Sequence, residues 1–526
     1  MSIFLDRYDN PQHVRTRQLR AFWTWLLWFL FVMGLAGLLS LVMVKRGPNV
    51  SLIAWLVYLA GVAVIFYRPR YGLYVVIFLV LVGDNYLTPW FPFTKNFSSH
   101  ESLLYLHDAL IISPLESYFA FIFISWLGRG AMQRRMKFYF SELFIPALVF
   151  LGFIFFGLFY GIYTGGNLNI ALWESRPIFY LIAMFFLTSN LIETRKQASN
   201  LFWASMLALF VEGLIGSYYF LVTLRASLNG VEAITDHAAA IHMNTLFVFT
   251  AAVWLYKASS AKRFILPWMI PPVFLTYLAT QRRAAFLTLA IALVLMAILL
   301  FLENRRAFWL IVPPLAVVGA LYIVVFWNAG GALGLPAQAV KSVVATDQAD
   351  AADQSSNLYR QIENVNTGFT IHQRPFTGIG FGQKFYVIVP LPDISFFEWW
   401  QYFPHNSIIW IWLKMGVGGF VAMLFFVGSA IMVGVRALWR MPRDDLSAMA
   451  ATAVLYIVMH FIYAYADISW DTQSMVYVGM MIGLLGALEH ITSQPVPQPP
   501  TRWPWQSKPE PAPEIRPFPP ATNSTK

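Results

Sequence analysis

The sequence contains no cysteine and few charged residues. The absence of cysteine from 526 residues excludes disulfide bonds and thiol chemistry. Only 12% of the residues are charged, whereas 58% are hydrophobic. A single water-exposed globule of this composition would have too little polar surface to stay dissolved. The composition therefore predicts an all-α integral membrane protein, with the bilayer as its solvent.

Long apolar runs recur along the chain. A membrane-spanning helix needs about 20 mostly apolar residues, and about 12–14 transmembrane helices are expected on this criterion. The third run is the weakest, because Asp84 and Pro89 interrupt it, and only Gln281 to Arg283 separate the two runs between 264 and 302. The candidate spans lie near 21–44, 50–67, 71–90, 109–128, 141–163, 170–192, 201–224, 242–258, 264–281, 284–302, 308–328, 405–435, 449–466 and 472–490.

Lysine and arginine gather in alternate loops, which indicates the orientation. Loops rich in these residues face the cytoplasm in most membrane proteins. Both termini are then cytoplasmic, and the long segment before residue 405 is on the opposite side. The net charge of +10 does not indicate nucleic-acid binding, because the cations fall in short clusters between apolar runs. The cationic loops contain Arg68 and Arg70; Arg129, Arg134, Arg135 and Lys137; Arg195 and Lys196; Lys257, Lys262 and Arg263; Arg305 and Arg306; and Arg436, Arg440 and Arg443.

These patterns divide the chain into five regions. Residues 1–20 form a cytoplasmic N-terminus, and residues 21–328 a transmembrane bundle. Residues 329–404 form a large periplasmic loop containing short helices, and residues 405–490 complete the bundle. Residues 491–526 are rich in proline and lack apolar periodicity, so a disordered cytoplasmic tail is expected.

Ionisable side chains at the outer ends of the spans are the first functional candidates, because charge at membrane depth is costly. Arg282 and Arg283 lie together at an outer boundary, contrary to the positive-inside trend, and this favours an anion site at Arg283 over a plain interfacial anchor. Arg176 lies near the outer end of the sixth span. An anion site and a local pairing with Glu174 are equally compatible with its position.

The large loop contains a third arginine, Arg360, and a glycine-rich phrase from Arg374 to Gly382. The phrase does not join a strand to a helix, and no Lys-Ser or Lys-Thr follows it, so nucleotide binding is not expected. Its glycines instead predict a tight turn where the loop folds back on the membrane. Such a turn would let the backbone approach a ligand or another segment.

His405, in the run from Phe403 to Ser407, lies where the large loop re-enters the membrane. Pro404 precedes it and suits the first turn of a helix, so His405 is expected in that turn, at the interface. Proton transfer beside an anion and a structural hydrogen bond are both compatible with this position. Trp399 and Trp400 could stack on a glycan, although interfacial anchoring is the simpler interpretation. No protein-bound catalytic metal is expected, since no pair of histidines has zinc spacing; the other outer or intramembrane candidates are His237, His242, His460, Asp467 and Asp471.

Residues 170–435 resemble the O-antigen ligase and O-antigen polymerase superfamily, whose members are membrane glycosyltransferases of the GT-C type. The resemblance is carried by Gln281-Arg282-Arg283-Ala284, by the phrase from Arg374 to Gly382, and by Pro404-His405-Asn406-Ser407 followed by Gly416 and Gly418. The family commonly has Ser-Arg-Gly where this chain has Arg282-Arg283-Ala284. Local alignment assigns the family arginine to Arg283, with Arg282 as the alternative.

The resemblance implies glycan transfer at the periplasmic face of the bacterial inner membrane. The donor would be a polyprenyl-diphosphate-linked oligosaccharide, and the acceptor a saccharide or the lipid A core. Arg176, Arg283 and Arg360 would bind the diphosphate, and His405 would deprotonate the acceptor hydroxyl. The reaction would be inverting, without metal or cofactor.

The other expected partners are membrane lipids and other polysaccharide-export proteins, and no nucleic acid is expected. Polymerase and ligase remain equally open. The alternative is a polytopic transporter or a flippase for lipid-linked glycans. Such a protein would place its charges near mid-membrane, whereas Arg176, Arg283, Arg360 and His405 all map to the outer side.

Overall fold

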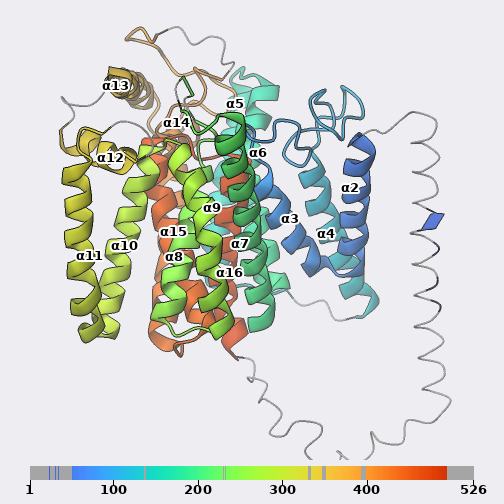
Figure 1. The fold of residues 1–526 in the computed structure, drawn as a ribbon. Coiled ribbons are helices and arrows are strands. Elements are labelled where there is room, and N and C mark those ends of the chain that lie inside the picture. Colours follow the sequence, from blue (N-terminus) through green and yellow to red (C-terminus); the bar gives the residue numbers. More distant parts are fainter. Residues whose placement is uncertain are drawn as a thin grey trace, which may run out of the picture.

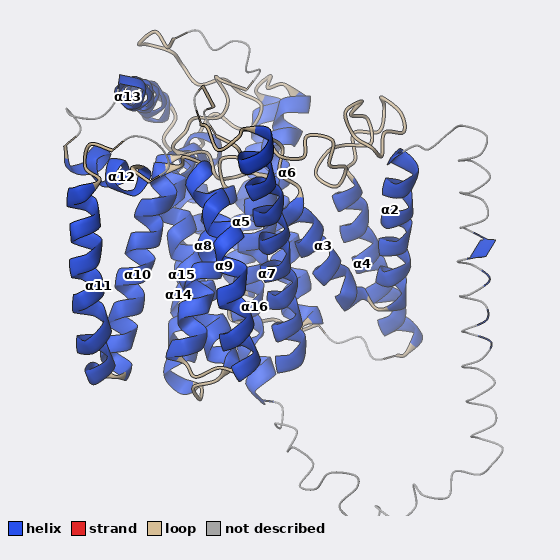
Figure 2. Ribbon diagram, viewed as in Figure 1, coloured by secondary structure: helices blue, strands red, loops and turns tan. Residues whose placement is uncertain are grey.

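The structure is a computed structural model that describes residues 50–134, 138–228, 230–231, 233–329, 333–345, 351–392 and 399–493, together with residues 23, 26, 30, 33 and 34. Within these ranges the regular elements are helices, and no strand occurs among them (Figure 2). Nearly all of the span expected at 21–44, and the proline-rich tail from residue 494 onward, lie outside the described residues.

The described helices run nearly parallel in one bundle, with α12 and α13 at one end of it (Figure 1). Their bounds are α2 Val50–Tyr67, α3 Pro69–Val82, α4 Pro114–Met132, α5 Phe144–Tyr163, α6 Leu168–Leu191, α7 Arg195–Tyr218 with a π-helical extension Tyr219–Thr223, α8 Ala239–Leu255, α9 Ser260–Ala279, α10 Arg283–Glu303, α11 Arg305–Val325, α12 Leu335–Val344, α13 Ala351–Gln373, α14 Ser407–Arg440, α15 Asp445–Ala466 and α16 Thr472–Ser493.

Each apolar run predicted from residue 50 onward coincides with a helix. Among the described residues, nine helices are long and apolar enough to cross a membrane, and α3 and α8 are shorter apolar helices. The third run ends earlier than expected, at Val82 and not near residue 90. Asp84 explains this, because its carboxylate accepts the backbone N–H groups of Tyr86 and Leu87, both at 2.8 Å, and so fixes a turn.

The centre of the bundle is formed by α6, α15 and α16, and its edge by α10 and α11 (Figure 1). Gly479 and Gly483 are four residues apart on α16 and face the backbone of α6, at Leu181 and Phe185. A side chain at either glycine would collide with these backbone atoms. Small residues with this spacing let two membrane helices pack closely, which is a main source of helix association in lipid. At the edge, α11 buries none of its residues, so its surface is left to lipid.

One long helix, α14, is broken at Gly416, whose φ of 68° and ψ of −176° are not helical. The break frees backbone groups that lipid could not satisfy. The glycine-rich segment 374–382, called here the glycine loop, supplies their partners. The N–H of Ile379 donates to the carbonyl of Leu413 at 2.8 Å, and the N–H of Val417 donates to the carbonyl of Pro375 at 2.9 Å. The glycine loop is thereby fixed to α14.

The glycines of this loop are required by its close contacts. Gly378, Gly380 and Gly382 all have positive φ, between 65° and 84°. A Cβ on Gly378 would lie 2.5 Å from the carbonyl oxygen of Leu413, and one on Gly380 would collide with the backbone of Gly161. The sequence left open whether this turn approaches a ligand or another segment of the chain. In the structure its backbone approaches other segments, at Leu413 and Gly161.

Candidate functional site

His405 lies just before α14, outside the helix. Asn406 is the N-cap, and its side chain accepts the N–H of Ile409 at 3.0 Å. The prediction that His405 lies in the first helical turn is therefore wrong. The physical reason is that an asparagine side chain can accept a free N–H of the first turn, which makes Asn406 the better place for the helix to begin. His405 is left in the preceding loop, facing α13.

Glu363 of α13 holds His405 in place. The same carboxylate oxygen, Oε2, accepts the backbone N–H of His405 at 2.7 Å and lies 3.0 Å from Nδ1 of its ring. Glu363 has a side-chain exposure of 1%, whereas His405 retains 24%. Because a carboxylate can only accept, Nδ1 carries the proton in this contact and a neutral ring keeps Nε2 as a proton acceptor. The ring of Tyr359 meets the histidine edge-on, with centroids 5.5 Å apart.

Asp467 forms a second cluster beside His405. Its carboxylate lies 3.3 Å from Nδ1 of His237 and 3.8 Å from the guanidinium of Arg360. Its backbone carbonyl accepts the hydroxyl of Ser407 at 3.2 Å, which connects the cluster to the start of α14. Arg360 and Glu363 are three residues apart on α13 and so share one face of that helix. One face of α13 therefore contacts both Asp467, through Arg360, and His405, through Glu363.

Opposite charges in this cluster stabilise one another's ionised forms. Burial alone would raise the pKa of Asp467, but the hydrogen bond and charge of His237, with the charges of Arg360 and Arg282, hold that pKa below its usual range. Burial would also lower the pKa of His237, and Asp467 more than offsets this, so that the pKa of His237 is raised. The cluster therefore favours an ionised carboxylate beside a protonated histidine.

Two adjacent arginines lie at the junction of α9 and α10. Arg282 is the N-cap of α10 and Arg283 is its first residue. Arg282 acts electrostatically on Asp467, His237 and Tyr463, which places its charge at the cluster. Arg282 was the alternative in the sequence alignment. It and Arg360 both act on the carboxylate of Asp467.

Arg176 lies on α6 and contacts residues outside that helix. Its Nε lies 3.5 Å from the carboxylate of Glu116, and its Nη1 lies 3.2 Å from the side-chain oxygen of Asn96. Glu174 does not pair with it. Instead Glu174 forms a fully buried ion pair with Lys414 of α14 at 2.8 Å. The local pairing of Glu174 with Arg176, considered from the sequence, is therefore wrong, because helix α6 directs Glu174 inward.

The Glu174–Lys414 pair also holds the glycine loop. The backbone N–H of Gly382 donates to Glu174 at 2.6 Å, and the ammonium of Lys414 donates to the carbonyl of Gln383 at 2.6 Å. Both charges are thus paired and hydrogen-bonded, as buried charges must be. The pair fixes α6, α14 and the large loop against one another.

A polar cavity of about 940 Å³ opens at the same end of the bundle. Arg176 and Lys95 line it, and so does Trp399, whose ring stacks on Trp173 with centroids 4.0 Å apart and an interplanar angle of 11°. Of the two tryptophans singled out in the sequence, Trp399 lines the cavity and Trp400 does not. Phe403, two residues before His405, and Ile468, directly after Asp467, also line it, so the cavity adjoins both residues along the chain.

Aspartate side chains contribute to the lining of this cavity. Burial and the nearby charge of Asp236 raise the pKa of both Asp84 and Asp471 to about 6. Asp471 and Asp236 line the cavity, and Asp84 accepts the N–H of Asp236 at 2.7 Å. No three His, Asp or Glu side chains in the described ranges are grouped so as to hold a metal ion. The lining of the cavity therefore contains both cations and carboxyl groups, and Lys95 is paired there with Glu101.

The structure brings several predicted residues together and adds others. Helix α13 brings His405 and Arg360 together, because Arg360 lies on it and its Glu363 binds His405. The charges of Arg360 and Arg282 both act on Asp467, whereas Arg176 lines the adjoining cavity. Glu363 was not predicted, although its spacing of three residues from Arg360 was a usable signal. Lys414 was not predicted either. A lysine within the apolar run 405–435 is itself a signal, because charge at membrane depth needs a partner.

The fold and the site define a multi-pass, all-α membrane protein with clustered ionic groups at one end, which confirms the predicted fold class. Residues 269–424 match the family described as O-antigen ligase. The chain is also 25% identical over 258 residues to an O-antigen ligase of Salmonella typhimurium (strain LT2), an alignment that covers 47% of this chain and 58% of that protein. These two findings confirm the resemblance to the O-antigen ligase and polymerase superfamily.

Proposed function

We propose that this protein transfers a glycan from a polyprenyl-diphosphate-linked donor to a saccharide acceptor at the periplasmic face of the inner membrane. The observation that carries the proposal is the pairing of His405 with Glu363 beside the arginine-bearing Asp467 cluster. The match of residues 269–424 to the O-antigen ligase family supports it, because that segment contains Arg282, Arg283, Arg360, Glu363 and His405.

His405 acts as the general base. Glu363 holds Nδ1 as a donor, and Nε2 accepts the proton of the acceptor hydroxyl. The hydroxyl oxygen forms a bond to the anomeric carbon of the donor while the bond from that carbon to the diphosphate oxygen breaks. The lipid diphosphate leaves with the bonding electron pair, and attack from the opposite side inverts the anomeric centre. The energy for transfer is already held in the glycosyl diphosphate.

The arginines bind the diphosphate. Arginine forms forked hydrogen bonds to phosphate oxygens and stabilises the negative charge that grows on the leaving group. Arg360 and Arg282 bind the diphosphate beside His405, because both act on Asp467, and Arg283 is the alternative to Arg282. Arg176 lines the adjoining cavity, whose size and polar walls suit the sugar units next to the diphosphate. The stacked Trp173 and Trp399 offer an aromatic face to those sugars.

The test is an assay with the purified full chain, a polyprenyl-diphosphate-linked oligosaccharide and a lipid A core acceptor, with product measured by gel and mass spectrometry. His405→Ala is expected to lower the transfer rate by about 100-fold or more, which is the usual range for loss of a general base. His372→Ala is the matched control, because His372 is exposed on α13 at the same end of the bundle. Unchanged transfer by a normally inserted His405→Ala protein would exclude the mechanism.

The same assay distinguishes the two adjacent arginines. Arg282→Gln is expected to reduce transfer more than Arg283→Gln, because the charge of Arg282 acts on Asp467. A larger loss in Arg283→Gln would assign the diphosphate to Arg283 and leave Arg282 as a support for Asp467. A polymerase would extend the donor glycan on itself, whereas a ligase would require the lipid A core, so the acceptor dependence of the product separates these two activities.

A further inference from the structure

A membrane-facing groove lies at the end of the bundle opposite His405. It occupies about 530 Å³ between the start of α5 and the second half of α14. Leu424, Phe425 and Met432 line it and are exposed, and Gly428 lowers its wall because nothing lies within 4 Å of the place a Cβ would take. A groove of this kind on a membrane helix accommodates an acyl chain.

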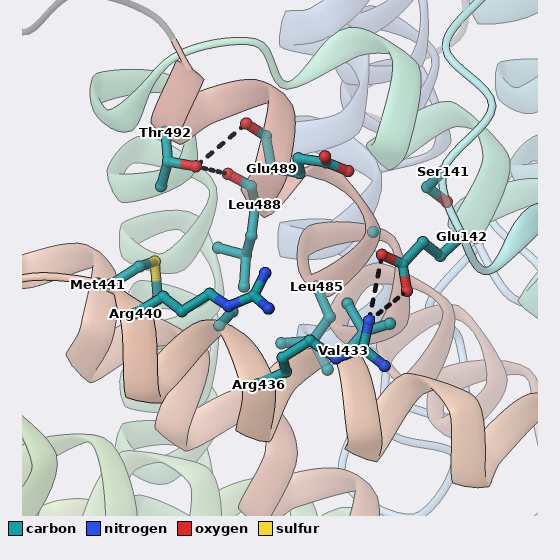
Figure 3. Close-up of a pocket in the computed structure, with 12 residues that line it drawn as sticks. Ser141, Glu142, Val433, Arg436, Arg440, Met441, Leu485, Leu488, Glu489 and Thr492 are labelled. Carbon is teal, nitrogen blue, oxygen red and sulfur yellow. Dashed lines mark hydrogen bonds and ion pairs between the residues drawn. The ribbon is translucent and has the colours of Figure 1, made fainter.

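The groove continues into a smaller polar pocket of about 140 Å³ between α14, α16 and the segment before α5 (Figure 3). The two cavities share Glu142, Val433 and Arg436, so they form one site with an apolar part and a polar part. This arrangement matches an amphiphile that has a tail and a headgroup.

The polar pocket contains charges of both signs. Arg436 is neutralised by Glu142, with which it forms two contacts of 2.9 and 3.3 Å. Arg440 and Glu489 remain. Arg440 points into the pocket from α14, and Glu489 stands on the α16 wall (Figure 3). Oε2 of Glu489 accepts the hydroxyl of Tyr139 at 3.5 Å, and among the described residues no ion pair joins Glu489 to Arg440, although both line this pocket. One cation and one carboxylate are therefore available to a ligand between them.

Ser141 gives an independent sign of a missing ligand. Its side chain is 8% exposed and lines the pocket, and its hydroxyl has no hydrogen-bond partner within the described part of the chain. A buried hydroxyl without a partner costs free energy, so such groups are normally satisfied. Gly486 lies opposite, where a Cβ would come within 2.9 Å of that hydroxyl oxygen. The missing side chain keeps the space beside Ser141 open.

We infer that this site binds a zwitterionic diacyl phospholipid whose headgroup carries a primary ammonium. The phosphate contacts Arg440 and the hydroxyl of Ser141, the ammonium contacts Glu489, and an acyl chain lies along Leu424, Phe425 and Met432. Basic pockets between membrane helices bind lipid headgroups, and a single-sign basic pocket would select an anionic lipid. Here the balance of carboxylates and arginines favours a headgroup that carries both charges. This binding does not depend on glycan transfer.

Native mass spectrometry of the full chain in detergent tests the inference. The protein is titrated separately with phosphatidylethanolamine and phosphatidylglycerol of identical acyl chains. Phosphatidylethanolamine is expected to bind about tenfold more tightly, the range of one charge-assisted hydrogen bond. Arg440→Gln and Glu489→Gln are each expected to weaken that binding by about tenfold. Arg306→Gln, an exposed arginine at the same end, is the control and is expected to bind as the unchanged protein does.

Three results would overturn the inference. Equal binding of the two lipids would show that the site does not recognise the ammonium, and tighter binding of phosphatidylglycerol would show a simple anion site. Equal effects of Arg440→Gln and Arg306→Gln would place the lipid elsewhere. Ser141→Ala removes only a hydroxyl that has no partner in the described structure, so it keeps the fold; it is expected to weaken phosphatidylethanolamine binding by a few-fold.

Discussion

The two ends of the bundle use ionic groups in different ways. At the His405 end Glu363, Asp467 and Glu174 are buried carboxylates, and each connects segments that are distant in the sequence. Glu363 is 1% exposed and contacts His405, 42 residues away. At the opposite end Arg436–Glu142 and Arg443–Glu303 are open to solvent, and their arginine side chains are 45% and 52% exposed. Buried charge is costly, so its concentration at one end marks where the protein maintains a chemical site.

The ion pairs at the opposite end have another origin. Arg443 pairs with Glu303, Arg195 with Asp444 and Lys262 with Asp445, and these cations come from the loops that the positive-inside pattern assigned to the cytoplasm. Such cations are accounted for by topology. The exposed pairs that these cations form are therefore expected to contribute little to the stability of the fold. The comparison predicts that substitutions at the two ends differ strongly in effect.

The largest effect is expected from Lys414. Lys414→Ala leaves the carboxylate of Glu174 buried and uncompensated, which typically costs about 3–5 kcal/mol of stability. The expected result is a large fall in the midpoint of thermal unfolding in detergent, with low recovery of folded protein. The double variant Glu174→Gln, Lys414→Met removes both charges and should recover most of the loss. A Lys414→Ala protein as stable as the parent would contradict the role of this pair.

An intermediate effect is expected from Glu363. Glu363→Gln keeps a hydrogen-bond acceptor but removes the charge that orients His405, so kcat should fall by about tenfold to hundredfold with little change in KM. Glycan-transfer kinetics with the purified chain measure this split. Glu363→Asp should restore part of the rate, and Gln361→Ala, on the exposed side of α13, should leave kcat unchanged. A parallel loss of kcat and protein stability would indicate a structural role alone.

The smallest effect is expected at the opposite end. Arg443→Gln breaks the pair with Glu303, in which Arg443 is 52% exposed. Solvent-exposed ion pairs contribute about 0–1 kcal/mol, so the unfolding midpoint and the transfer rate should both change little. A loss as large as that of Lys414→Ala would remove the distinction between the two ends.

The sequence predicted most of the helices, because an apolar run long enough to cross a bilayer has few alternative structures. It predicted their ends less well. Asp84 ended α3 early by accepting backbone N–H groups, and Asn406 caps α14, so that the helix begins after His405 and not before it. Both deviations come from short polar side chains that satisfy backbone donors, and hydrophobic periodicity does not reveal such contacts.

The candidate site was predicted only in part. His405, Arg360 and Arg176 stood out because charge at a membrane boundary is unusual, and Asp467 and His237 stood out only as members of a longer set. Their grouping depends on how α13 lies over the bundle, which local sequence does not determine. The choice between Arg282 and Arg283 likewise rests on the turn between α9 and α10, where Gln281 adopts a φ of 56°.

The hydrogen bonds of the glycine loop set an order for assembly of the protein. The loop precedes α14 in the chain, but its partners Leu413 and Val417 lie within α14. During synthesis the loop is therefore made before the helix that it completes. Until the two meet, the break at Gly416 exposes backbone groups without partners. The break can therefore close only after both the loop and α14 have been made.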